Sequence, residues 1–185
     1  GVEITGGTWG NNSLMTVADI TGSVGMLLSR AGDFSSNIEP SGKINVVGIF
    51  DQEDTSFPHT ENYRIWVRKY DDIAKALSFC REVRDCVVGE RVALINKVVS
   101  RVSDEYFYVQ DQDRSGGIKI ISDRLYEPGD VVCVQGVVSF DGEEYSIIPK
   151  YLTAGRTDIK PMFVTSPTLW AEGGLDVYGL LVKCY

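Results

Sequence analysis

The sequence predicts an all-β protein built from two small barrels in tandem. Two segments, 14–29 and 106–122, carry one pattern. They share three residue types at an offset of 92 residues, as Val17/Val109, Asp19/Asp111 and Gly25/Gly117. Two such periods make 184 of the 185 residues, which indicates an internal repeat. Most other segments are short and rich in β-branched and aromatic residues, as strands are.

The expected strands are separated by clusters of Gly, Asp, Asn and Pro. They include 44–50, 62–68, 92–99, 105–110, 117–121, 131–138 and 144–148. Asp141-Gly142 predicts a tight hairpin, because both central residues of a type I′ turn need positive φ. One helix is expected, at 71–79, where Asp71 or Asp72 can cap it and Ile73, Ala76 and Leu77 share a face.

The two halves align beyond the first pattern. The segment 42–48 corresponds to 129–136, and 63–70 corresponds to 145–151. Gly48 and Gly136 then fall at matching places in the middle of a strand. Because glycine weakens a strand unless a bulge or bend is wanted, these positions predict strands that coil round a small barrel.

Residues 71–151 resemble an OB-fold, a five-stranded Greek-key barrel. The order is a short helix, VALINKVVS, YFYVQDQDRSGGIKII and GDVVCVQGVVSFDGEEYSII. The stretch resembles OB-type modules of secreted, multi-domain bacterial surface proteins, and 42–73 resembles the closing part of a neighbouring module. The resemblance implies two OB-like five-stranded Greek-key barrels in tandem. We expect them over 1–70 and 71–157, with 158–185 as a linker and the first strand of a next barrel.

The two ends of the sequence suggest how copies could associate. The segment 178–185, YGLLVKCY, looks like the opening strand of a further barrel, whereas GVEIT leaves the first barrel without a complete first strand. We expect either one period of a longer tandem array or a barrel completed by a strand from an adjacent subunit. The residues predicted to form this contact are Leu180, Leu181, Val182, Cys184 and Tyr185 in the donated strand, and Val2 and Ile4 in the strand it meets.

Composition limits the partners. The chain has 26 acidic and 18 basic residues, a net charge of −8, and its bases are scattered. Nucleic acid is therefore an unlikely partner, since affinity for it comes mainly from clustered Lys and Arg. No run approaches the roughly 18 apolar residues of a membrane span, so no membrane insertion is expected. The expected partners are copies of the chain itself, head to tail.

The four cysteines do not indicate a small disulfide scaffold. Cys80 and Cys86 could close a short loop, which would contribute roughly 2 kcal/mol. Cys133 and Cys184 lie in strand patterns, which favours buried thiols over bridging. With His59 as the single histidine and no CxxC, neither a structural zinc nor a cofactor is expected.

Two acidic clusters raise the question of calcium, which prefers several closely spaced oxygens. They are Asp111, Asp113 and Asp123, and Asp51, Glu53 and Asp54. Neither matches the EF-hand pattern, so we expect solvated turn carboxylates and no metal. Asp19 and Asp111 are expected to bond locally in the turn between strands two and three. Asn11 begins an N-glycosylation acceptor that applies only in a secreted chain.

Aromatic residues offer a possible ligand face. Tyr106 and Tyr108 lie where an oligonucleotide-binding barrel presents stacking aromatics. The alternative, favoured because basic residues do not surround them, places Phe107 inward and packs the tyrosines on a neighbour. Trp9 and Trp170 lie in Gly-rich loops, where an aromatic plug between domains is plausible.

No catalytic motif appears: GxSxG, a Walker loop and HExxH are all missing, so an enzyme is not expected. The leading hypothesis is a non-enzymatic extracellular structural protein, the repeat unit of a head-to-tail filament or cell-surface array. The alternative is a saccharide- or single-stranded nucleic-acid-binding OB module, accessory to a larger secreted protein.

Overall fold

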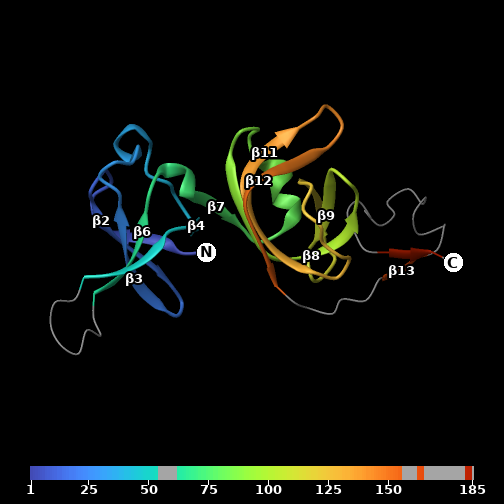
Figure 1. The fold of residues 1–185 in the computed structure, drawn as a ribbon, viewed down its shortest axis with the longest axis horizontal. Coiled ribbons are helices and arrows are strands. Elements are labelled where there is room, and N and C mark those ends of the chain that lie inside the picture. Colours follow the sequence, from blue (N-terminus) through green and yellow to red (C-terminus); the bar gives the residue numbers. More distant parts are fainter. Residues whose placement is uncertain (54–61, 156–161, 165–181, 185) are drawn as a thin grey trace. The chain divides into compact units, whose positions relative to one another are not determined.

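The computed structural model describes residues 1–53, 62–155, 162–164 and 182–184 (Figure 1). The chain divides into two compact units, Gly1–Ala76 and Leu77–Tyr185. The predicted all-β class is confirmed. Besides strands, the described residues form only three short 3₁₀ segments, η1 (Phe34–Ser36), η2 (Tyr70–Asp72) and η3 (Cys80–Asp85). No helix in this part of the chain is long and apolar enough to span a membrane.

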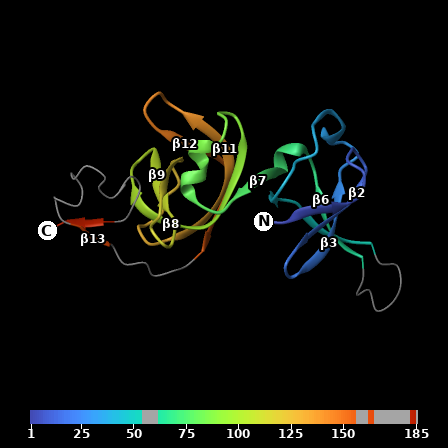
Figure 2. The ribbon, with the colours of Figure 1, turned by 180° about the vertical axis from the view of Figure 1, so that it is seen from behind.

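Unit 2 contains a closed five-stranded barrel. Its strands are β8 (Arg91–Val102), β9 (Tyr106–Gln110), β10 (Gly117–Ile121), β11 (Val131–Phe140) and β12 (Tyr145–Gly155). They pair in the order β8-β9-β10-β12-β11, and β11 returns to β8 to close the barrel (Figures 1 and 2). Only the β10–β12 pair is parallel. This topology is the OB-type Greek key.

The barrel of unit 2 encloses an apolar core. Phe107 on β9 is fully buried and packs beside Tyr126. This agrees with the interpretation in which the Phe107 side chain points inward. η3 adds Cys80 and Val83 to the same core. A segment that precedes the first strand therefore covers part of the barrel interior.

Unit 1 repeats this strand order in a less complete form. Its strands are β1 (Glu3–Gly6), β2 (Leu14–Asp19), β3 (Gly22–Leu28), β4 (Ile44–Val46), β5 (Ile49–Gln52), β6 (Tyr63–Val67) and β7 (Ile73–Leu77). The sheet order is β1-β2-β3-β6-β5, with β3 and β6 parallel. β4 pairs with β7, and a single bridge joins Val2 to Ile44. β4 and β5 are thus two halves of strand four, and β6 and β7 two halves of strand five.

The prediction of a helix at 71–79 is wrong. Residues 70–72 form η2, and Ile73–Leu77 form β7, antiparallel to β4. Ile73 and Ala74 are both buried in this arrangement. The local pattern fits a helix face as well as a strand, and pairing with the distant β4 decides between them.

The bulge or bend predicted at the middle of strand four is present at Gly136 in the closed barrel of unit 2. A Cβ on Gly136 would lie 2.2 Å from the carbonyl oxygen of Ile148, and a Cβ on Gly48 would lie 2.7 Å from that of Trp66. In unit 2, the register between β11 and β12 shifts at this glycine. A Cβ at either position would therefore require strands four and five to move apart.

One part of the predicted repeat is wrong. Val17 pairs with Val24 in β2–β3, whereas Val109 pairs with Ile118 in β9–β10. The third strand is therefore offset by 94 residues, and Gly25 matches Lys119 rather than Gly117. The cause is the turn, which spans two residues between Asp19 and Gly22 but is longer after β9. The alignment of Tyr63 with Tyr145 holds, since Ile65 and Ile147 occupy equivalent pairs.

The Asp141-Gly142 hairpin forms, but with a wider turn than predicted. Phe140 pairs with Tyr145, and positive φ occurs at Gly142 but not at Asp141. The Asp141 carboxylate instead accepts hydrogen bonds from the backbone N–H groups of Glu143 and Glu144. Side-chain bonding of this kind shapes the loop in place of a type I′ turn.

Trp9 packs inside unit 1 rather than between domains. Its ring meets Phe34 and Tyr70 edge to face, and Nε1 donates to the carbonyl oxygens of Phe34 and Asn37 at 2.9 Å each. Trp170 lies outside the described residues. Near the C-terminus, β13 (Met162–Val164) pairs in parallel with β14 (Val182–Cys184). Leu180, Leu181 and Tyr185 of the predicted donated strand are also outside the described residues.

Candidate functional site

Strand four is β11 in unit 2 and β4 together with β5 in unit 1. Its surroundings differ between the two units. In unit 2, β8 covers the edge of β11: Val137 pairs with Arg91, Val138 N donates to Glu90 O at 2.9 Å, and Gly89 N donates to Val138 O at 2.9 Å. In unit 1, β5 is the last strand of its sheet, and no strand of the described residues pairs with its outer edge.

Phe50 is the counterpart of Val138. Phe50 pairs with Ile65 as Val138 pairs with Ile147, so the peptide groups of Phe50 also face away from strand five. Its side chain shares the inward face with Ile65, which packs against the unit 1 core. Phe50 is nevertheless 71% exposed, whereas Val138 is 1% exposed. Tyr63 stacks on the Phe50 ring, with centroids 5.4 Å apart.

Strand one of unit 1 aligns with part of β8. Val2 meets Ile44 where Lys97 meets Val132, and Ile4 meets Val17 where Val99 meets Val109. In this register Gly1 matches Asn96, so the counterparts of Arg91–Ile95, which in unit 2 include the residues that pair with β11, would stand before Gly1. Ile4 lies in β1, Val2 forms a bridge to Ile44 just before it, and both pack against the unit 1 core; their contact with a donated strand stays a prediction. Sequence reasoning missed Phe50, although an apolar residue two positions after the mid-strand Gly48 was the signal available.

A second exposed feature of unit 1 is an apolar row on the outer face of its sheet. Leu14 pairs with Leu27, Leu27 with Trp66, and Trp66 with Ile49, so the row crosses four strands. Leu14 and Ile49 are exposed, and Trp66 is 40% exposed. The sequence pattern did not single out this row, because its members come from four separate segments.

The first acidic cluster is paired with a cation. Arg64 Nε lies 2.7 Å from Asp51 Oδ2, and the guanidinium also contacts Glu53. The hydrogen bond from Arg64 holds the pKa of the Asp51 carboxyl below its usual value. Asp54 lies outside the described residues. Within those residues, no group of three or more His, Cys, Asp and Glu side chains could hold a metal ion.

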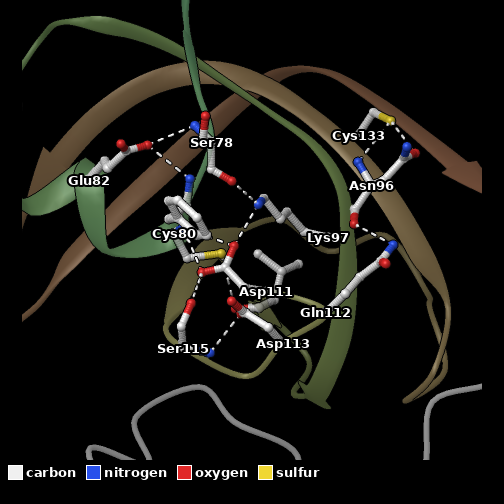
Figure 3. Close-up of polar contacts among 12 residues, drawn as sticks. Ser78, Cys80, Glu82, Asn96, Lys97, Asp111, Gln112, Asp113, Ser115 and Cys133 are labelled. Atoms are coloured by element: carbon white, nitrogen blue, oxygen red, sulfur yellow. Dashed lines mark hydrogen bonds and ion pairs between the residues drawn. The ribbon is translucent and has the colours of Figure 1, made fainter.

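The second acidic cluster contains a buried ion pair (Figure 3). Lys97 Nζ lies 2.5 Å from Asp111 Oδ1, and the two side chains are 7% and 3% exposed. Lys97 Nζ also donates to the Ser78 carbonyl at 2.5 Å, and the backbone N–H of Cys80 lies 3.1 and 3.0 Å from the two Asp111 oxygens. Asp111 is therefore not the local turn carboxylate that was predicted. Asp19 is one, accepting bonds from Thr21 N and Oγ1 at 2.8 and 2.6 Å.

A small cleft opens beside this ion pair. It has a volume of about 270 Å³, and Phe79, Asn96 and Gln112 line it with Lys97 and Asp111. Asp113 accepts a hydrogen bond from the backbone N–H of Ser115 at 3.0 Å. The Ser115 hydroxyl donates to Asp111 Oδ2 at 3.4 Å. Sequence reasoning did not link Lys97 to Asp111, because their contact follows only from the pairing of β8 with β9.

The predicted ligand face around Tyr106 and Tyr108 is engaged in contacts within the chain. Both tyrosines are half-buried. The Tyr108 hydroxyl donates to Glu144 Oε2 at 2.8 Å, and Lys119 Nζ lies 4.8 Å from the centre of the Tyr106 ring. Burial, followed by the bond to Glu144, raises the pKa of Tyr108. These contacts match the packed alternative weighed for the two tyrosines.

The proposed disulfide is not formed in the structure. Cys80 and Cys86 stand at the start and just past the end of η3, and both are buried. A 3₁₀ segment rises about 2 Å per residue, so six steps separate their Cα atoms by about 12 Å. A disulfide spans at most about 7 Å. Burial, followed by the Asp111 carboxylate, raises the pKa of the Cys80 thiol.

The possible glycosylation acceptor Asn11 uses its amide within unit 1. Nδ2 donates to the Gly32 carbonyl at 2.6 Å, and Oδ1 accepts the Ser35 backbone N–H at 3.1 Å. N-glycosylation leaves one N–H on Nδ2, which can keep the bond to Gly32, so glycosylation of Asn11 stays a prediction.

The strand order defines the class of protein: an all-β chain with a closed OB-like barrel in unit 2 and a partly open sheet of the same order in unit 1. No family model matches the chain, and no curated protein matches it.

Several solved structures are similar in part. The hypothetical protein ygiW from E. coli is 23% identical, over 44% of this chain and 89% of that one, with a TM-score of 0.36. A murine DNA binding protein bound with ds DNA is 13% identical, over 86% and 96% of the two chains, with a TM-score of 0.40. The Ifi202 HINa domain in complex with 20bp dsDNA is 11% identical, over 84% and 95%, with a TM-score of 0.38. Likenesses this distant carry no conclusion about function, and the fold rests on the strand pairing.

Proposed function

We propose that the chain is a repeat unit of a non-enzymatic, extracellular, head-to-tail assembly. In this assembly, strand four of unit 1 receives a strand from the neighbouring repeat. The observation that carries the proposal is the inward-facing but 71% exposed side chain of Phe50, beside an outer edge of β5 with which no strand of the described residues pairs. An unpaired edge offers a row of N–H and C=O groups to another strand.

Unit 2 indicates what the added strand would supply. There Val92 and Leu94 of β8 are fully buried against the core, and β8 pairs with β11. An equivalent strand on β5 would cover Phe50, and burying a phenylalanine side chain contributes about 1.5–3 kcal/mol. The new backbone hydrogen bonds would add to this.

The donor we propose is the predicted assembly strand, which includes Leu180, Val182 and Cys184 of the neighbouring repeat. Val182 and Cys184 have the same spacing as Val92 and Leu94. Among the described residues, Val182–Cys184 pair with Met162–Val164 of β13. Transfer to strand four would replace this pairing. A head-to-tail contact of this kind generates a fibre or a linear array when successive copies do not close into a ring.

Electron microscopy and analytical ultracentrifugation of the purified chain at high concentration test the proposal. The wild type should form linear polymers, and Phe50→Asp should remain monomeric because a charge would then face the added strand. Phe50→Asp should change the free energy of unfolding of the monomer little, since Phe50 is mostly exposed. Ile20→Asp, at an exposed turn of the same unit, is the matched control and should polymerise.

Two outcomes would overturn strand exchange between separate copies. One is a wild-type chain that stays monomeric at high concentration, and the other is a Phe50→Asp variant that polymerises as the wild type does. The mass of the parent polypeptide distinguishes the two forms of the assembly. A mass far above the 20.4 kDa of this chain supports a covalent tandem array, and a mass near it supports exchange between subunits.

A second candidate function is saccharide binding by the outer face of unit 1. Trp66, 40% exposed, lies between Leu27 and Ile49, and the Arg64–Asp51 pair lies on the same face. An exposed indole can stack on a sugar ring while these polar groups bind hydroxyls. The net charge of −8 favours a neutral sugar over nucleic acid.

A glycan array and a titration with single-stranded DNA at low salt separate these ligands. Saccharide binding that Trp66→Ala abolishes would support the second candidate. DNA binding that weakens steeply as salt rises would indicate the nucleic-acid alternative instead.

A further inference from the structure

Lys97 and Asp111 form a buried ion pair with a short contact between the amine and the carboxylate. Two opposite charges removed from water are costly to bury, and such a pair is often no more stable than apolar residues of the same volume. Both side chains here are more than nine-tenths buried, at an Nζ–Oδ1 distance of 2.5 Å. Lys97 Nζ is therefore in contact with Asp111 Oδ1, which is bonded directly to Cγ, the carbon of the carboxyl group.

The groups around the pair fit a neutral amide. Lys97 Nζ already donates to the Ser78 carbonyl, and the Cys80 backbone N–H already meets the Asp111 oxygens. An amide joining the two side chains would keep both bonds, with its N–H on Ser78 O and its oxygen on Cys80 N. It would also remove two charges from a buried site, where each charge raises the free energy of the folded state by its loss of hydration.

We propose that Lys97 and Asp111 condense to an isopeptide bond, so that unit 2 carries an internal cross-link between β8 and the turn after β9. A proton passes from the Lys97 ammonium to the Asp111 carboxylate, which leaves a neutral amine beside a carboxylic acid. The Nζ–Cγ bond then forms, one Cγ–Oδ bond breaks, and the oxygen leaves as water with two of the three ammonium hydrogens. Atoms and charge balance without an oxidant or a co-reactant.

Neighbouring residues have defined tasks in this step. The Cys80 N–H and the Ser115 hydroxyl lie where they can stabilise the oxygen that becomes negative as Nζ attacks. Burial holds the two reacting groups together, which replaces an encounter in solution by a step within one site. The cleft beside the pair gives the released water a path out.

Mass spectrometry of the intact, denatured and reduced chain tests the proposal. Condensation lowers the mass by about 18 Da relative to the sequence. Digestion should then yield one branched peptide containing Lys97 and Asp111, with no tryptic cleavage after Lys97. Locating the branch matters because dehydration elsewhere, for instance at Asp141-Gly142, gives the same mass change.

Lys97→Arg is the matched control, since it keeps the positive charge and removes the amine nucleophile. It should show the full sequence mass, as should Asp111→Ala. The proposal is refuted if the folded wild type keeps its full mass after prolonged incubation between about pH 5 and pH 8, or if Lys97→Arg loses water as the wild type does. A circular dichroism spectrum shows whether each variant is folded.

Discussion

Replacing Gly136 with alanine tests whether the close approach of strands four and five requires glycine. The new Cβ would lie 2.2 Å from the Ile148 carbonyl oxygen and 2.8 Å from both Ile147 Cγ2 and Pro149 Cα. Two of these three atoms belong to the backbone, so no side-chain rotation relieves the contact. β11 cannot move aside easily either, because β8 pairs with its other edge.

The expected loss follows from this geometry. Overpacking a well-filled site costs about 1–3 kcal/mol, and we expect Gly136→Ala near the upper end. For a unit of about 100 residues, 2–3 kcal/mol lowers the melting temperature by about 10–20 °C. Gly48→Ala meets Ile65 Cγ2 at 2.5 Å and Trp66 O at 2.7 Å, but β5 is an edge strand and can shift. It should therefore cost about 1 kcal/mol.

Guanidinium unfolding followed by circular dichroism measures both effects, and hydrogen exchange with mass spectrometry assigns each transition to its unit. Gly6→Ala is the control, because its Cβ would meet only Thr16, at 3.8 Å, and should change stability by less than about 0.5 kcal/mol. If Gly136→Ala were as stable as the wild type, or no more costly than Gly48→Ala, the argument from close strand approach would be wrong.

Three further predictions concern single groups. Trp9→Phe should lower the stability of unit 1 by about 1–2 kcal/mol in denaturant unfolding, because two hydrogen bonds from Nε1 are lost while a ring remains; an unchanged midpoint contradicts this. The backbone N–H groups of Glu144 and Glu143 hold the pKa of Asp141 below its usual value, so Asp141 stabilises the fold above the ordinary aspartate pKa. That contribution is lost as pH falls through the lowered pKa, so Asp141→Asn should flatten the acid end of the stability profile, and an unchanged profile refutes the assignment. Because burial raises the pKa of Cys80, iodoacetamide at about pH 8 should label the half-buried Cys133 before Cys80 in the folded chain, and equal rates would contradict the burial of Cys80.

The strands could be predicted because their evidence is local. Alternating β-branched and aromatic residues, with turn residues between them, mark most strands of both units. The paired glycines Gly48 and Gly136 and the paired tyrosines Tyr63 and Tyr145 were also correctly matched. In each of these pairs the residues occupy equivalent positions in two copies of one topology, so the repeat is visible in the order of residues alone.

Elements that depend on a distant partner were predicted less well. Residues 73–77 are a strand because β4 pairs with them, and the match of Gly25 with Gly117 failed because two turns differ in length. The contact of Lys97 with Asp111 arises from the register of β8 on β9, and no spacing rule in the sequence marks it.

The sequence by itself determined the fold class, the two-unit repeat and the strand order, because these follow from local alternation, turn chemistry and the recurrence of both. Only the tertiary structure decided which groups are left exposed or enclosed. Phe50 and Val138 are both apolar residues two positions after a mid-strand glycine, yet one is 71% and the other 1% exposed. Exposure depends on whether another strand covers that edge, and strand cover is a property of the assembled sheet rather than of the residue and its neighbours in sequence.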